Sequence, residues 1–282
     1  MSDSSAAEST DLGVIAGQIE QEVQDGAIEL PLLPAAAAEV LASSLDDQSD
    51  AARLADLIQQ DQALASHVLR VVNSPAFRGA TEIVALQQGI ARRGMERIRE
   101  IALSAALKGS LFKKGGYDRV VDECWQVSLA AGLWSKEIAR AVRKNVEIAY
   151  LCGLLHNIGA PLILHRLGTL APGLDRVDVD SLLQQLSPMA GVQLAAAWQL
   201  PESVQITIDH LGRFAEAGDD ADQVAIAECG VALAQWMCTR TILIGDVLKL
   251  PAIEHLNLYP EDVETVLEQQ DSIKVSMDSM GL

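Results

Sequence analysis

Hydrophobic residues recur every three or four positions along most of the chain, which is the spacing of one face of an α-helix. Leu64, Val68 and Val72 give one example, directly after Asp61. Asp61 and Asp50 precede such stretches, and aspartate is a preferred residue at a helix N-cap. No segment of useful length alternates apolar and polar residues as a half-buried strand does. The pattern therefore predicts an all-α protein.

Prolines and glycines divide this pattern into separate helices. Proline fixes φ and restricts the residue before it, so residues 30–34 (Leu-Pro-Leu-Leu-Pro) are predicted to be a connector. The clearest internal break is at residues 113–116 (Lys-Lys-Gly-Gly), since paired glycines end helices. Helices are predicted from Val14 to the connector, over about 35–44, from Ser49 or Asp50, from Asp61 to Asn73, over about 83–90 and 95–111, along 121–138, from 148, from about 187 to 200, and over about 202–216 and 222–240.

These breaks predict a two-lobed helical bundle, with an N-terminal helical subdomain packed on a C-terminal one. A loop is expected from Pro172 to about Asp180, and one short amphipathic helix after residue 261. The predicted divisions are a disordered polar tail over residues 1–13, an N-terminal helical part over 14–114, a second helical part over 115–245, and an extension with a frayed tail over 246–282.

The composition adds two constraints. Of the 282 residues, 49% are hydrophobic but only 4% are aromatic, so the core must be aliphatic, as suits helices rich in Ala and Leu. The chain has 21 basic and 39 acidic residues and a net charge of -18. Such a surface repels phosphate backbones and anionic lipid heads, so neither direct nucleic-acid binding nor membrane binding is expected.

The N-terminus has no signal-peptide pattern, and no uncharged apolar run reaches the ~18 residues of a membrane span, so the predicted location is cytoplasmic. No two of the four cysteines have the C-x-x-C spacing of zinc or redox sites, so buried structural thiols are expected. A redox sensor that uses these cysteines is kept as an alternative.

Six motifs occur in an order typical of one family. They are Leu30-Pro31-Leu32-Leu33-Pro34, Ile58 and Asp61 followed by Leu64, Val68 and Asn73-Ser74, Ile83 to Ile90 followed by Gly94, Trp125 with Ser128, Gly153-Leu154-Leu155-His156-Asn157-Ile158-Gly159, and Trp198-Gln199-Leu200-Pro201 followed by Asp209-His210. Over residues 28 to 240 the chain resembles the HDOD family, the HD-related output domain of bacterial signalling proteins. The resemblance implies that the second helical part is a degenerate HD phosphohydrolase subdomain.

A working HD phosphohydrolase holds one or two divalent metals with His and Asp side chains. The resemblance places Val127 in the first histidine position, His156-Asn157 at the His-Asp dyad, Asp209-His210 at the paired histidines and Glu228 at the late aspartate. Valine has no lone pair to donate, and asparagine is a neutral substitute for a bridging carboxylate. The sequence therefore predicts no catalytic residues, no bound metal and no other cofactor.

The resemblance implies a non-catalytic regulatory module that acts through a signalling protein partner or a nucleotide ligand, as a monomer or a homodimer. The alternative is a residual metal-dependent phosphohydrolase or phosphodiesterase, or a second-messenger binder, using His156, His210, Asp209 and Glu228.

Two groups of residues are candidate ligand or partner contacts. Arg92, Arg93, Arg97 and Arg99 form a basic cluster in an acidic chain, and Asn73-Ser74 forms a helix-end corner. The competing interpretations are a solvated helix face for the arginines and local side-chain to backbone bonding for the corner.

Overall fold

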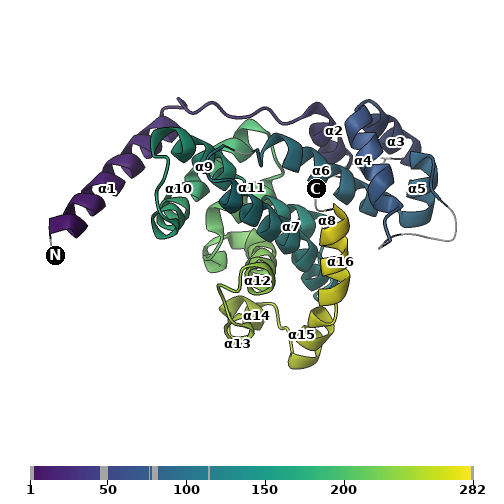
Figure 1. Cartoon of the computed structure of the whole chain (residues 1–282). Coiled ribbons are helices and arrows are strands. Elements are labelled where there is room, and N and C mark those ends of the chain that lie inside the picture. The colour runs from purple at the N-terminus through teal and green to yellow at the C-terminus, as the bar shows by residue number, and fades with distance from the viewer. Residues whose placement is uncertain (1–2, 45–49, 76, 78–81, 114, 281–282) are drawn as a thin grey trace.

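A computed structural model describes residues 3–44, 50–75, 77, 82–113 and 115–280. These residues form helices joined by turns and loops and contain no strand, which confirms the all-α prediction (Figure 1). The predictions for Ser49 and Lys114 lie outside the described residues.

The elements follow one another with short connections, apart from the segments between α1 and α2 and between α4 and α5. Their bounds are α1 Asp3–Gln24, α2 Ala35–Ser44, α3 Ala51–Gln59, α4 Gln62–Val72, α5 Leu86–Arg93, α6 Met95–Ser110, α7 Asp118–Ala141, α8 Val146–Leu155, α9 Gly159–Leu170, α10 Arg176–Ala197, α11 Glu202–His210, two 3₁₀ turns Phe214–Glu216 and Gly218–Asp220, α12 Ala221–Cys238, α13 Ile244–Val247, α14 Pro251–His255, α15 Pro260–Leu267 and α16 Gln270–Met280.

The predicted two lobes are present. Helices α2 to α6 form the N-terminal lobe, and α7 to α12 form the larger C-terminal lobe around α7 (Figure 1). The lobes share one aliphatic core that runs from Ala37 to Met280. Since apolar area is buried continuously across the junction, the lobes are packed on each other rather than tethered.

Helix α1 packs on the C-terminal lobe, although its position in the sequence assigned it to the N-terminal part. Ile19 and Val23 are buried against α9 and α10, and Arg166 of α9 forms a two-point ion pair with Glu22 at 2.6 and 2.7 Å. The helix begins at Asp3, so the disordered tail predicted for residues 1–13 was wrong. Residues 3–12 contain neither proline nor glycine, so nothing local ends the helix there.

The connector then crosses from one lobe to the other. Trp198 at the end of α10 donates from Nε1 to the carbonyl of Pro31 at 2.8 Å. The late Trp-x-Leu-Pro motif thereby holds the Leu-Pro-Leu-Leu-Pro motif in place. Both predicted N-caps are confirmed, because Asp50 accepts from the amide of Arg53 and Asp61 from that of Leu64.

Helix α10 begins earlier than predicted. Asp175 caps it by accepting from the amide of Asp178 at 2.9 Å, so part of the loop expected from Pro172 to Asp180 is already helical. The helix therefore starts well before the predicted residue 187 and continues through Pro188. Leu182 and Leu186 are buried before it, and their packing outweighs the hydrogen bond that an internal proline removes.

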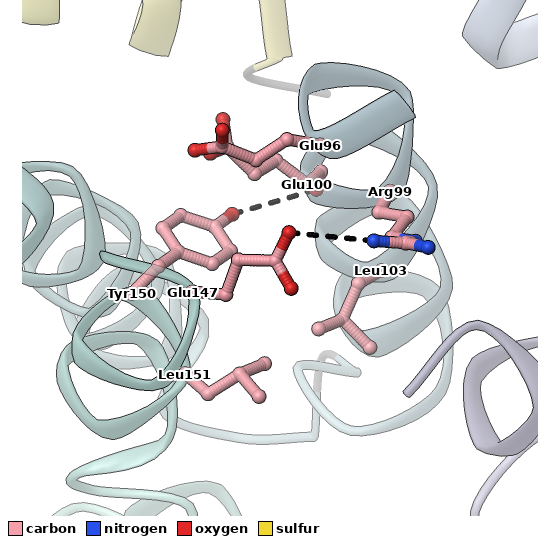
Figure 2. A pocket seen from close by; sticks show the side chains of 7 residues that line it. All are labelled: Glu96, Arg99, Glu100, Leu103, Glu147, Tyr150 and Leu151. Carbon is pink, nitrogen blue, oxygen red and sulfur yellow. Dashed lines mark hydrogen bonds and ion pairs between the residues drawn. The ribbon is translucent and has the colours of Figure 1, made fainter. Parts of the chain in front are cut away.

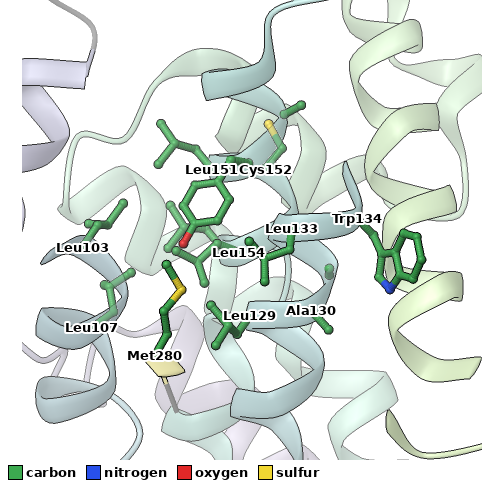
Figure 3. Packing of buried hydrophobic residues seen from close by; sticks show 14 of the residues in the cluster. Leu103, Leu107, Leu129, Ala130, Leu133, Trp134, Leu151, Cys152, Leu154 and Met280 are labelled. Atoms are coloured by element: carbon green, nitrogen blue, oxygen red, sulfur yellow. The ribbon is translucent and has the colours of Figure 1, made fainter. Parts of the chain in front are cut away.

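The C-terminal extension is not frayed over its described residues, which corrects another prediction. Helices α15 and α16 turn back so that α16 lies along α6 and α7 (Figure 1). Met280 of α16 is 1% exposed and points between Leu103 and Leu107 of α6 and Leu129 of α7 (Figure 3). Apolar burial at Ile273 and Met280 fixes a helix that the sequence shows only as weakly amphipathic.

One stretch, residues 146–170 across α8 and α9, is long and apolar enough to cross a membrane by composition, but 78% of its most apolar window is buried inside the protein. A helix of this kind is apolar on all sides because neighbouring helices surround it.

Candidate functional site

The turn between α8 and α9 holds the His156-Asn157 pair, and two glycines position it. A Cβ on Gly153 would lie 2.5 Å from the Ala131 carbonyl of α7. A Cβ on Gly159 would lie 2.1 Å from the Ser187 carbonyl of α10. The motif therefore brings the backbones of neighbouring helices together at points where only glycine fits.

The imidazole of His156 is 8% exposed, and its Nδ1 donates to the carbonyl of Gly153 at 2.7 Å. Burial lowers the pKa of His156 to about 4, although this backbone bond acts to raise the pKa. The ring is therefore neutral near pH 7, with its lone pair on Nε2. One imidazole is a single metal ligand, and a stable site needs several.

The residues at the other HD positions make contacts within the fold. Glu228 on α12 is half-buried and accepts from the amide of Phe214 at 3.2 Å, with further backbone bonds from Gly212 and Arg213. Burial raises the pKa of Glu228 despite these bonds. Its carboxylate therefore caps the turn after α11 instead of facing a metal.

Asp209 and His210 are at the end of α11, near the surface. His210 Nδ1 lies 3.3 Å from the Ile206 carbonyl and 3.5 Å from an Asp209 carboxylate oxygen. Arg213 approaches the same Asp209 carboxylate at 4.0 Å. Val127 on α7 packs partly buried against the core, and Asn157 lies in the α8–α9 turn.

No three His, Cys, Asp or Glu side chains in the described ranges come together as metal ligands. The single imidazole at His156 and the capping carboxylate of Glu228 do not fit the donor set that a hydrolytic metal needs. No hydrolytic step follows from these residues.

The buried His156 predicts that the protein loses stability in mild acid. Between pH 6.5 and 4 the unfolded chain binds a proton at this residue and the folded chain does not. The free energy of unfolding should then fall by up to about 1.4 kcal/mol per pH unit from this residue alone. Urea unfolding at pH 7.5, 6 and 5 measures the fall, and a His156→Gln variant should show a shallower one. Equal slopes in both proteins would contradict the prediction.

The comparison with protein families agrees with this geometry. The model of the HDOD domain matches residues 30–212, which is most of the two lobes. The chain belongs to the HDOD domain family. The match covers the connector, the N-terminal lobe and the positions from Val127 to His210, whereas Glu228 and α12 to α16 follow it. Family membership and the HD-like arrangement of the C-terminal lobe, expected from the ordered motifs, are thereby confirmed.

Solved structures with the same fold include proteins from bacteria. One, provisionally named a metal-dependent phosphohydrolase, is from Shewanella amazonensis SB2B; it has a TM-score of 0.74 and 20% identity, covering 95% of this chain and 99% of that one. Another, provisionally named a signal transduction protein, is from Marinobacter aquaeolei VT8. It has a TM-score of 0.63 and 19% identity, and the match covers 96% of this chain and 67% of that one. Such identities show a shared HDOD fold and no more.

An uncharacterized protein of Treponema pallidum (strain Nichols) is 23% identical over 203 residues. The match covers 68% of this HDOD chain but only 39% of that relative, so the chain corresponds to about two-fifths of the relative's length.

The four arginines of the predicted basic cluster lie in different environments. Arg99 of α6 is buried and pairs with Glu147 of α8 at 3.3 Å beside Tyr150, around a cavity of about 20 Å³ that would hold one water (Figure 2). Burial raises the pKa of Glu147, and the charge of Arg99 only partly offsets this. Arg99 is therefore part of a buried ion pair at the junction of the two lobes and does not contribute to the surface.

Arg97 is held by contacts within the fold as well. Its guanidinium pairs with Glu100 at 2.7 Å, donates to Ser276 of α16 at 2.6 Å and lies 4.8 Å from the centre of the Phe77 ring. Arg92 is exposed at the end of α5, and Arg93 lines a cleft of about 530 Å³ between α6, α7 and α16. Only Arg92 and Arg93 thus belong to the surface expected from the sequence.

The Asn73-Ser74 corner has two separate roles. The Asn73 amide donates to the carbonyls of Leu69 and Ile83 and accepts from the amide of Ile83, all within 2.9 Å. It therefore joins the end of α4 to the segment before α5. Ser74 donates to Ser279 of α16 at 3.2 Å, so part of the predicted partner surface contacts the chain's own C-terminal helix, which sequence reasoning missed.

The cysteines are free thiols, and burial raises their pKa values, to about 12 for Cys152 and Cys229 and about 11 for Cys124 and Cys238. Thiolate chemistry requires a lowered pKa, so these sites do not favour the redox-sensor alternative.

Proposed function

We propose that this HDOD protein is a non-catalytic regulatory module that works by binding a signalling partner in the cytoplasm. The observation that supports it most is the use of the former metal positions within the fold. Glu228 caps a turn, Asp209 faces Arg213, and Val127 packs against the core. A hydrolase would need these positions free to hold a metal and its activated water.

Two further observations support regulation. The signal-transduction name of the Marinobacter protein belongs to a chain of the same fold. Arg92 and Arg93 also put positive charge at the surface of a protein with a net charge of -18. Because long-range charge steers association, an acidic segment of a partner is the expected contact there.

One experiment with three proteins tests this function. Wild type, His156→Ala/His210→Ala and Arg92→Gln/Arg93→Gln are loaded with manganese or zinc, desalted and analysed for metal and for hydrolysis of bis-p-nitrophenyl phosphate. Each is then used to capture partners from native lysate. Substoichiometric metal, no hydrolysis, and a specific partner that only the arginine variant loses are expected.

An Arg119→Gln/Arg240→Gln variant is the matched control, because it removes the same charge from exposed positions elsewhere. One metal per chain, together with hydrolysis abolished by His156→Ala/His210→Ala, would establish the residual hydrolase instead.

A further inference from the structure

The N-terminal lobe contains a second concave site, remote in sequence from the HD positions. A cavity of about 520 Å³ opens between α4 and α6, beside Pro34 at the end of the connector. Leu64, Ala105 and Ala106 give it an apolar floor, and His67, Arg70 and Lys113 supply polar groups. Small-molecule sites have this size and this combination of an apolar lining with few polar groups.

Charge pairing distinguishes this cavity from the cleft beside α16. In that cleft Arg97, Lys136 and Arg140 each pair with a glutamate. Arg70 and Lys113, in contrast, have no carboxylate partner among the residues that the structure describes. Two such cations on one cavity are unexpected in a chain with 39 acidic and 21 basic residues. The one acidic residue of the lining, Asp61, is already committed to capping α4.

His67 holds Arg70 at the edge of the same cavity. Its side chain is only 7% exposed, and its Nδ1 lies 2.6 Å from Arg70 Nη2. A guanidinium can only donate, so Nδ1 accepts and the hydrogen of the neutral ring is on Nε2, which is buried on the other side of the ring. Burial, with the charges of Arg70 and Lys108, lowers the pKa of His67 to about 4, which keeps the ring neutral. The imidazole therefore orients the Arg70 guanidinium beside the cavity.

We propose that this cavity binds a small molecule with an oxyanion group, a phosphate or a carboxylate, on an apolar body. The oxyanion pairs with Arg70 and Lys113, while the apolar body covers Leu64, Ala105 and Ala106. Charge-assisted hydrogen bonds favour an anion over a neutral acceptor at such a group of donors. The site is independent of the proposed partner surface on α5.

Phenyl phosphate is the probe, with inorganic phosphate for the oxyanion alone, benzoate for the carboxylate case and benzyl alcohol for the uncharged body. The imidazole resonances of His67, assigned with a His67→Gln variant, report binding in the full chain by NMR. Phenyl phosphate or benzoate should shift them at lower concentration than inorganic phosphate, and benzyl alcohol should not shift them.

Arg70→Gln and Lys113→Gln should each weaken binding of the phenyl anion by at least about tenfold. Arg70 and Lys113 are exposed, so both variants should fold. Lys249→Gln, which removes one exposed positive charge in the C-terminal extension, is the matched control and should bind as wild type. Absence of a His67 shift at saturating phenyl phosphate and benzoate, or equal binding by Arg70→Gln and Lys249→Gln, would overturn the proposal.

Discussion

Replacing Gly159 with alanine is expected to lower the free energy of unfolding by about 3 kcal/mol or more. The new Cβ would lie 2.1 Å from the Ser187 carbonyl and 2.6 Å from the Gly191 amide, both backbone atoms of α10. Backbone cannot rotate away as a flexible side chain can, so α9 and α10 must separate and lose buried contacts. For a domain of this size the melting temperature should fall by roughly 6 to 12 °C.

Gly17→Ala is the control for this change. Gly17 is inside α1, and a Cβ there meets nothing within 4 Å. Alanine is a better helix former than glycine, so this variant should be unchanged or more stable by up to about 1 kcal/mol. Calorimetric melting of both variants measures the contrast. Similar melting temperatures for Gly159→Ala and Gly17→Ala would show that α9 and α10 are not closely packed at this point.

Replacing Lys136 with methionine should cost about 3 kcal/mol, because it removes a cation that pairs with the buried Glu100 carboxylate, which then keeps Arg97. Lys136 of α7 reaches across to α6, where it pairs with Glu96 at 2.7 Å and with Glu100. Glu100 is 4% exposed, so water cannot replace the lost ammonium group. Burial alone would raise the pKa of Glu96, but the bond and charge of Lys136, with the charge of Arg140, lower it.

Two comparisons isolate this effect. Lys144→Met removes the ion pair between Lys144 and Asp222. Both side chains are more than 40% exposed, so the change should cost at most about 1 kcal/mol. Glu100→Gln added to Lys136→Met removes the uncompensated charge and should recover part of the loss. Denaturant unfolding gives all values. A loss at Lys136 no larger than that at Lys144 would mean that the network does not stabilise the junction.

The fold was predictable where the signal was local. Asp61 caps α4 as expected, because an N-cap bond joins residues three apart and needs no tertiary contact. The early start of α10 was missed because the sequence does not show that Leu182 and Leu186 are buried. That burial depends on α1 and α9, which sequence spacing does not place there.

The sequence gives the residue types at the candidate HD positions but not the contacts that those residues make in the fold. The assignment of Val127 and Asn157 to HD positions rests on motif order, and both residues lie within the family match. Glu228 remained a candidate metal ligand in the sequence. Its carboxylate caps a turn 14 residues earlier, and the sequence does not distinguish a capping carboxylate from a metal ligand. The surface role predicted for Arg97 and Arg99 failed for the same reason, since their partners Ser276 and Glu147 are on other helices.

The sequence by itself determined the all-α class, two helix caps and the family, because helix periodicity, capping and motif order depend on neighbours along the chain. The tertiary structure alone decided that α1 covers α9 and α10, that α16 occupies the junction beside Arg97 and Ser74, and that His67 faces a cavity with Arg70 and Lys113. The physical reason is that these contacts come from apolar faces meeting across large separations in the sequence, and burial then decides which charges are paired.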